Sequence, residues 1–168
     1  MSSSTPYSIA TKSNTTTTGS DAVWSFAQRV NTDTTTNINN AGLTTIPIDG
    51  GMITNQSGYA INGNGIQLTG VGAYVKCTFV VHVTSVTNRT NMTLRLAKNG
   101  VLFGPVSASG YIRNASGHNE SSFTATAWTK METNDIITVE AIQEANAGTV
   151  TMATAGTSQL LLERLVNV

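Results

Sequence analysis

The residues from Ala73 to Ser85 read AYVKCTFVVHVTS, and they decide the fold. Neighbouring side chains on a strand point to opposite faces, so residues two apart share a face. One face of this stretch is apolar and carries Val75, Cys77, Phe79, Val81 and Val83. The other face is mixed and carries Tyr74, Lys76, Thr78, Val80 and His82. This alternation predicts one long strand that packs a single face on a core.

The segment that follows predicts a hairpin. Residues 91–98 alternate apolar side chains at Met92, Leu94 and Leu96 with smaller or polar ones. Asn99-Gly100 then forms the strongest short-range hairpin signal, because both residues tolerate positive φ. The chain returns through VLFGPV at 101–106, so we expect two antiparallel strands here.

Shorter strands are predicted on both sides of this centre. Residues 21–30, DAVWSFAQRV, fit either a strand or a helical stripe, and the surrounding pattern favours a strand. Further strands are expected near 46–48, 58–63, 65–70, 121–131, 136–145 and 159–166. Eight to ten short strands separated by turns indicate an all-β sandwich, jelly roll or barrel.

The composition limits the function classes. The 168 residues suffice for one domain and a tail, and 39% of them are hydrophobic. Only 11% are charged, and nine basic residues balance nine acidic ones. That balance gives no electrostatic attraction for nucleic acid or for an anionic membrane, so we expect neither as a partner.

Cys77 is the only cysteine in the chain. No internal disulfide and no cysteine metal cluster can therefore form. Its place on the apolar face of the long strand predicts a buried, inert thiol rather than a nucleophile, which would need a nearby base.

The chain ends with SQLLLERLVNV, residues 158–168, and this segment does not alternate. Leu160, Leu161 and Leu162 place apolar side chains on both faces of the last strand. Something must cover the second face, because an exposed apolar strand promotes aggregation. The cover is either a loop of the same chain or another copy of the chain.

Three segments, read in order, resemble a known superfamily. GVGAY, which enters the long strand at Gly72-Ala73-Tyr74, is similar to the Gly-x-Tyr of complement globular heads and of tumour-necrosis-factor-like jelly rolls. LAKNG resembles their strand that ends in Asn-Gly, and KMETNDIITV resembles their Leu-x-x-Gly-Asp-x-Ile-x-Val, with Met131, Asp135, Ile137 and Val139 at the matching positions. The chain departs from the motif at Asn134, where the family has Gly; Asn is the next best residue at positive φ.

The resemblance covers roughly residues 22–168 and implies a two-sheet antiparallel jelly roll that assembles as a trimer. Domains of this superfamily turn their inner sheets toward a three-fold axis, and the closing strand belongs to that sheet. A homotrimer would therefore explain leucines on both faces of the last strand. The trimer interface that we expect contains Ala125, Ala127, Leu160, Leu161 and Leu162.

No catalytic or metal-binding motif is apparent. His118 and Glu120 form the nearest approach to a metal pair, but two ligands in a Gly/Ser loop fall short of a site. The sequence contains no nucleophile elbow, no phosphate-binding loop and no His-Glu-x-x-His helix. We expect a non-enzyme with no catalytic residues, no metal and no cofactor.

Residues 1–20 are polar and low in complexity, and they predict an N-terminal arm in front of a jelly-roll domain at 21–168. Tyr7 and Ile9 are the expected anchors of this arm on a partner, since only they and Met1 carry large apolar side chains there. No apolar run is long enough for a signal peptide or a membrane span, so we expect folding in a cytosol.

These features favour a structural protein of a phage virion, assembled in the host cytoplasm. The leading hypothesis is a trimeric decoration (cement) protein that binds the major capsid protein, or another virion protein, at three-fold sites. A fibre tip that recognises a host surface glycan is the alternative; Tyr111 and Trp128 would be candidate contacts, although we expect both in the core. A secreted or spore-surface binding module is the second alternative.

Overall fold

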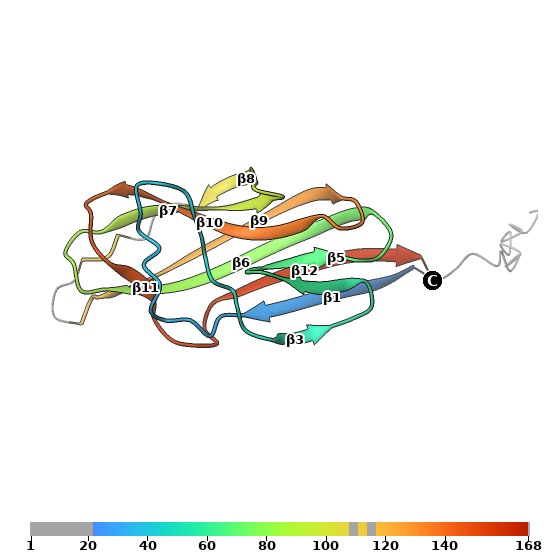
Figure 1. Cartoon of the computed structure of the whole chain (residues 1–168), viewed down its shortest axis with the longest axis horizontal. Coiled ribbons are helices and arrows are strands. Elements are labelled where there is room, and N and C mark those ends of the chain that lie inside the picture. The colour runs from blue at the N-terminus through green and yellow to red at the C-terminus, as the bar shows by residue number, and fades with distance from the viewer. Residues whose placement is uncertain (1–21, 108–110, 114–116, 168) are drawn as a thin grey trace, which may run out of the picture.

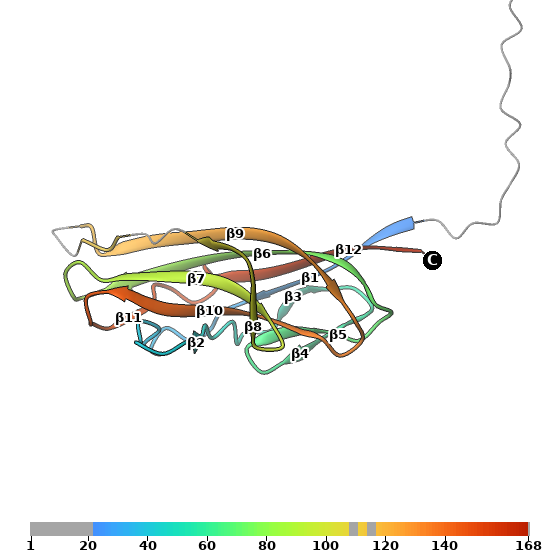
Figure 2. The same ribbon diagram turned by 90° about the horizontal axis from the view of Figure 1, so that it is seen from above.

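The computed structural model describes residues 22–107, 111–113 and 117–167, which form twelve strands in two antiparallel sheets. The sheets lie face to face and enclose one core, as Figures 1 and 2 show. In the described part of the chain, no helix has the length and apolarity that crossing a membrane would need. The prediction of a two-sheet antiparallel jelly roll is confirmed.

The first sheet, called sheet A, is organised around β6 (Ala73–Ser85). One edge of β6 pairs along its length with β9 (Glu120–Met131). The other edge pairs first with β12 (Gln159–Asn167) and then with the short β11 (Val150–Met152). Outward from β12 come β1 (Ala22–Val30) and β3 (Met52–Asn55).

The second sheet, called sheet B, is organised around β10 (Ile136–Ala145), which pairs with β7 (Asn91–Lys98). β8 (Val101–Ser107) follows β7 at one edge. On its other edge β10 pairs with β5 (Gly65–Leu68) and β2 (Thr44–Thr45), and β4 (Tyr59–Asn62) pairs with β5.

The sequence pattern located the long strands well. β6 has the bounds that alternation predicted, and residues 22–30 form a strand rather than a helix. The strand expected near 46–48 is reduced to the two-residue β2 just before it. The short strands β3 and β11 were missed, because segments of three or four residues are too short to show a clear period. The structure therefore has more strands than the eight to ten expected.

Two turns behave as their residues predicted. Asn99 and Gly100 both have positive φ, 51° and 79°, so the hairpin between β7 and β8 has the backbone that Asn-Gly favours. Asn134 has φ 75°, which explains why Asn can stand where the related motif has Gly. Asp135 closes this turn by accepting a hydrogen bond from the Glu132 backbone N–H at 2.8 Å and another from the Asn99 amide at 2.6 Å.

Two buried arginines hold loops to the ends of strands. Arg29 donates to the carbonyl oxygens of Gly50 at 2.7 Å and of Gly65 at 2.9 Å. Arg164 donates to the Val71 carbonyl at 2.7 Å, and its guanidinium lies over the Tyr59 ring, 5.1 Å from the centroid. Carbonyl oxygens and an aromatic face replace the water that a buried cation loses.

We expect the Cys77 thiol to react only after unfolding. Its side chain is fully buried, and burial raises the pKa of the thiol to about 12, so almost no thiolate exists at neutral pH. A chromogenic disulfide reagent should label the urea-unfolded chain within minutes and leave the native chain unmodified over hours. Stoichiometric labelling of the native chain at the unfolded rate would contradict the core assignment.

We expect stability to fall between about pH 4 and pH 2. The Thr36 hydroxyl, followed by the backbone N–H groups of Thr35 and Thr36, lowers the pKa of Asp33 to about 2. A carboxyl with a lowered folded-state pKa stabilises the protein above its unfolded pKa of about 3.9, and this contribution is lost as the pH falls through the folded value.

Urea unfolding between pH 6 and pH 2 would measure this loss. The Asp33→Asn variant should be less stable at pH 6 but should lose less stability on acidification than the original chain. Equal losses for both chains would show that Asp33 does not contribute to acid sensitivity.

Candidate functional site: the outer face of sheet A

Among the described residues, no three His, Cys, Asp or Glu side chains lie close enough together to hold a metal ion. Glu120, considered with His118 in the sequence, instead contacts His82, with 3.2 Å between its Oε2 and the ring Nε2. This pair joins β9 to β6 on the surface. The candidate site is instead one face of sheet A, which exposes several large aromatic side chains.

The outer face of sheet A consists of side chains that point away from the core on β1, β12, β6 and β9. Strand register arranges them in rows that cross all four strands. The rows are Phe26–Glu163–Lys76–Trp128, Gln28–Leu161–Thr78–Thr126 and Val30–Gln159–Val80–Thr124. Trp24 and Tyr74 extend this face beyond the first row, toward the end of the sandwich where β1 begins and β12 finishes.

Aromatic side chains concentrate at that end. We call Trp24, Phe26, Tyr74 and Trp128 the aromatic end of the outer face. Three of them are more than half exposed: Trp24 by 56%, Tyr74 by 68% and Trp128 by 57%. Both tryptophans of the chain thus lie on one surface of one sheet. Large aromatic side chains that neighbour one another on a surface are typical of an interface.

The polar groups on the outer face are largely matched to one another. Lys76 and Glu163 form an ion pair at 2.8 Å between β6 and β12, and both are half-buried. The hydroxyls of Thr78 and Thr126 lie 3.0 Å apart, and the Gln28 amide donates to Gln159. Because its charges are paired with one another, this face can be covered by neighbouring copies without burying an unpaired ion.

The three consecutive leucines of the last strand lie on different faces of sheet A. Leu160 and Leu162 are fully buried in the core, whereas Leu161 lies on the outer face between Gln28 and Thr78. The expected interface therefore has to be corrected for Leu160 and Leu162, because their side chains point into their own sandwich. Leu161 alone occupies the position that the prediction requires.

Ala125 and Ala127 are also core residues. Ala127 makes room within the chain: a Cβ added to Gly104 of β8 would come within 2.5 Å of the Ala127 Cβ. The small side chain of Ala127 thus allows β8 to approach β9 closely. This corrects the place that the sequence gave to both alanines.

Two aromatic residues expected in the core are at the surface. Trp128 belongs to the aromatic end, and Tyr111, at the opposite end of the sandwich, is 52% exposed. Tyr7 and Ile9, the expected anchors of the arm, lie outside the described residues.

Sequence reasoning missed Trp24, Phe26 and Tyr74 as members of one surface. Each was visible as the outward partner in an alternating strand, but alternation does not reveal which strands are neighbours. The pairing of β1 with β12 and of β12 with β6 brings these three side chains onto one surface. That pairing involves residues more than fifty positions apart.

Comparison with known proteins finds similar structures but no similar sequence. No protein-family model matches the chain, and no curated protein is detectably similar to it in sequence. Murine APRIL aligns over 84% of this chain and 99% of its own, with a TM-score of 0.57 and 13% identity. The Eiger TNF of S. frugiperda aligns over 86% of this chain and 94% of its own, with a TM-score of 0.56 and 10% identity. The chain therefore has a tumour-necrosis-factor-like jelly-roll fold.

Paired substitutions on the last strand should separate folding from association. Leu162→Asp places an unpaired charge in the core and should abolish cooperative folding, at a cost above about 4 kcal/mol. Leu161→Asp leaves the charge accessible to water in a single copy, so the chain should fold but fail to associate. Circular dichroism melts and sedimentation equilibrium would measure the two effects. A folded Leu162→Asp chain, or a Leu161→Asp chain that associates normally, would contradict this assignment.

Proposed function

We propose that this protein is a non-enzymatic structural protein whose copies associate as a homotrimer through the outer face of sheet A. The observation that carries the proposal is the aromatic end of that face, which is exposed in a single copy. The resemblance in the sequence supports three copies, because it implies that these sheets turn toward a common three-fold axis. The jelly-roll fold supports the same arrangement.

The aromatic end offers enough surface to drive association. Covering the exposed halves of three large aromatic side chains removes about 300 Å² per copy from water. At about 25 cal/mol per Å² this amounts to about 7 kcal/mol per copy. Association costs about 4–15 kcal/mol in lost freedom of motion. The aromatic end thus supplies a large share of what a trimer needs, and Leu161 and Val80 add aliphatic area.

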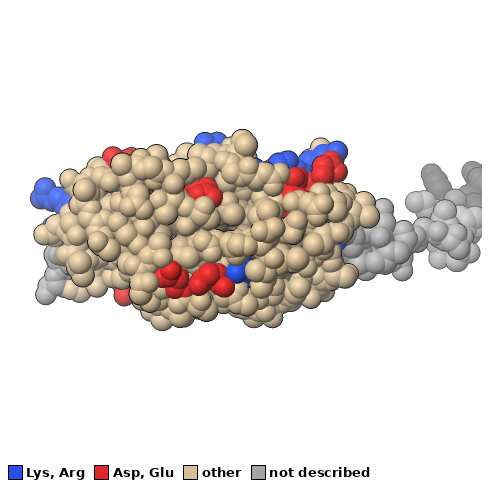
Figure 3. All heavy atoms as spheres, viewed as in Figure 1, with Lys and Arg blue, Asp and Glu red and all other residues tan. Residues whose placement is uncertain are grey.

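Within this class we propose a decoration protein of a phage capsid, bound at local three-fold sites by its N-terminal arm. A trimer matches the symmetry of such a site, so three identical arms can make three identical contacts. The balanced charge of the chain favours a protein partner over nucleic acid. The face seen in Figure 3, on the side of sheet B, is mostly uncharged, with few acidic and basic groups.

A fibre tip that binds a host glycan is the second candidate, and the exposed Tyr111 favours it. Such a tip would use the same trimer but would join a shaft through residues 1–20. The secreted or spore-surface module would also use the trimer. The three candidates differ in what the arm contacts.

Removing residues 1–20 should weaken attachment to the capsid and spare the trimer. The truncated and the full-length chain would each be titrated onto particles assembled without this protein, and bound copies counted by quantitative gel analysis. The reduced occupancy has a physical cause, since the arm would contribute contacts that the folded domain lacks.

Leu161→Asp provides the matched control, because it should keep the arm but remove the trimer, and with it three-fold avidity. Full occupancy by the truncated trimer would remove the arm from the attachment mechanism. Absence of binding by the full-length trimer would exclude the decoration role.

A further inference from the structure

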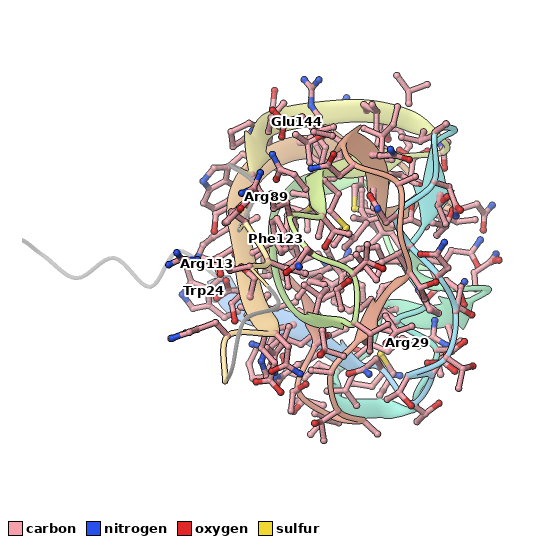
Figure 4. All side chains as sticks on the ribbon, turned by 90° about the vertical axis from the view of Figure 1, so that its left-hand side faces the viewer. Trp24, Arg29, Arg89, Arg113, Phe123 and Glu144 are labelled. Atoms are coloured by element: carbon pink, nitrogen blue, oxygen red, sulfur yellow. The ribbon has the colours of Figure 1, made fainter. Side chains whose placement is uncertain are left out.

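A shallow depression lies at the end of the sandwich opposite the start of β1. Asn88, Arg89, Tyr111 and Arg113 line it, and its volume is about 510 Å³. Figure 4 looks onto this end and shows Arg89 and Arg113 on the same side of the sandwich. None of these residues belongs to the rows of the outer face of sheet A, so the depression is separate from the proposed trimer surface.

An isolated antiparallel bridge between Thr90 and Ile112 builds the depression. Both residues are fully buried, and the Ile112 backbone N–H donates to the Thr90 carbonyl at 3.2 Å. Their neighbours Arg89, Tyr111 and Arg113 are exposed. Across such a bridge Arg89 stands opposite Arg113, with Tyr111 two residues before it.

Arg89 and Arg113 both line the depression, and an anion bound there can accept hydrogen bonds from either guanidinium. No ion pair among the described residues includes Arg89. Glu144 lies at this end as well, and it accepts a hydrogen bond from the Asn91 amide at 3.0 Å. In a chain with only nine basic residues, two at one bridge form an unusually cationic spot.

The backbone holds Arg89 in place at a conformational cost. Its φ is 60°, a region that residues other than Gly, Asn and Asp seldom occupy. The Asn146 amide fixes this conformation by donating to the Arg89 carbonyl at 2.8 Å. Residues with a strained backbone that is held by hydrogen bonds from other segments often occur at binding sites, where the strained conformation positions a side chain.

Tyr111 adds a second type of contact. Its ring is half exposed and borders the depression, so it offers a flat apolar surface with a hydroxyl at its rim. The Asn88 side chain adds an amide. The tyrosine ring, the asparagine amide and the two arginines together suit a ligand that has a flat face, many hydroxyls and a negative charge.

We propose that this depression binds an acidic saccharide, whose carboxylate or sulfate lies between Arg89 and Arg113 while a sugar ring packs on Tyr111. Arginine suits this role because its planar fork can donate two parallel hydrogen bonds to an oxyanion. A trimer would present three such sites at the end of the sandwich opposite the start of β1. The protein would then attach by one end and recognise an acidic glycan with the other.

Calorimetric titration of the full-length protein would test this site with three probes of equal length: an oligogalacturonate, a sulfated maltooligosaccharide and the unmodified maltooligosaccharide. We expect saturable binding of at least one acidic probe and none of the neutral one. The acidic probe that binds identifies carboxylate or sulfate as the recognised group.

Substitutions then locate the site. Arg89→Gln and Tyr111→Ala should each weaken binding of the acidic probe about tenfold, the loss of one charged hydrogen bond or one stacked ring. Lys98→Gln is the matched control, because it removes one partly exposed cation at the far end of β7, in sheet B, and should change affinity less than twofold. Sedimentation of each variant would verify that assembly is unchanged.

Three results would overturn the proposal: no saturable binding of either acidic probe, equal binding of the neutral probe, or an equal loss in Lys98→Gln. Each of them would leave the proposed trimer intact, since the outer face of sheet A contributes none of these residues. Failure of the trimer, in turn, would not remove saccharide binding by a single copy.

Discussion

The pairing of β6 with β9 on one edge and with β12 on the other determines the rest of the molecule. Strict alternation along β6 sends Val75, Cys77 and Phe79 into the core and the residues between them outward. Because register is fixed on both edges, the same pairing aligns every outward row on four strands. A shift of one residue would exchange the core face of β6 for its polar face. The fold and the candidate interface thus depend on one register.

How much of this could be read from the sequence differs between elements. The bounds of β6, the Asn99-Gly100 turn and the positive φ of Asn134 follow from local rules, and all were predictable. The place of Ala127 in the core, against Gly104, could not be predicted, because Gly104 lies on a strand of the other sheet. Contacts between distant strands carry no local signal. The same limit hid the aromatic end and the bridge beside Arg89.

The two surfaces divide the molecule into functional ends. The aromatic end lies where β1 begins and β12 finishes, and we propose that its exposed rings bind other copies of the chain. The opposite end has a half-exposed tyrosine and two arginines that line a depression. A rigid sandwich between them keeps the ends apart, since buried arginines fix the intervening loops to the strands. Assembly and recognition are therefore structurally independent in this account.

Tryptophan accessibility, followed as the protein is diluted, tests the central claim most directly. Trp24 and Trp128 are the only tryptophans, and both lie on the outer face of sheet A. Acrylamide quenching would report their exposure while sedimentation reports the mass of the assembly. If that face joins the copies, quenching is weak while three chains of 17.6 kDa sediment together, and it rises in step with dissociation. Strong quenching of an intact trimer, or a monomer at every concentration, would contradict the account.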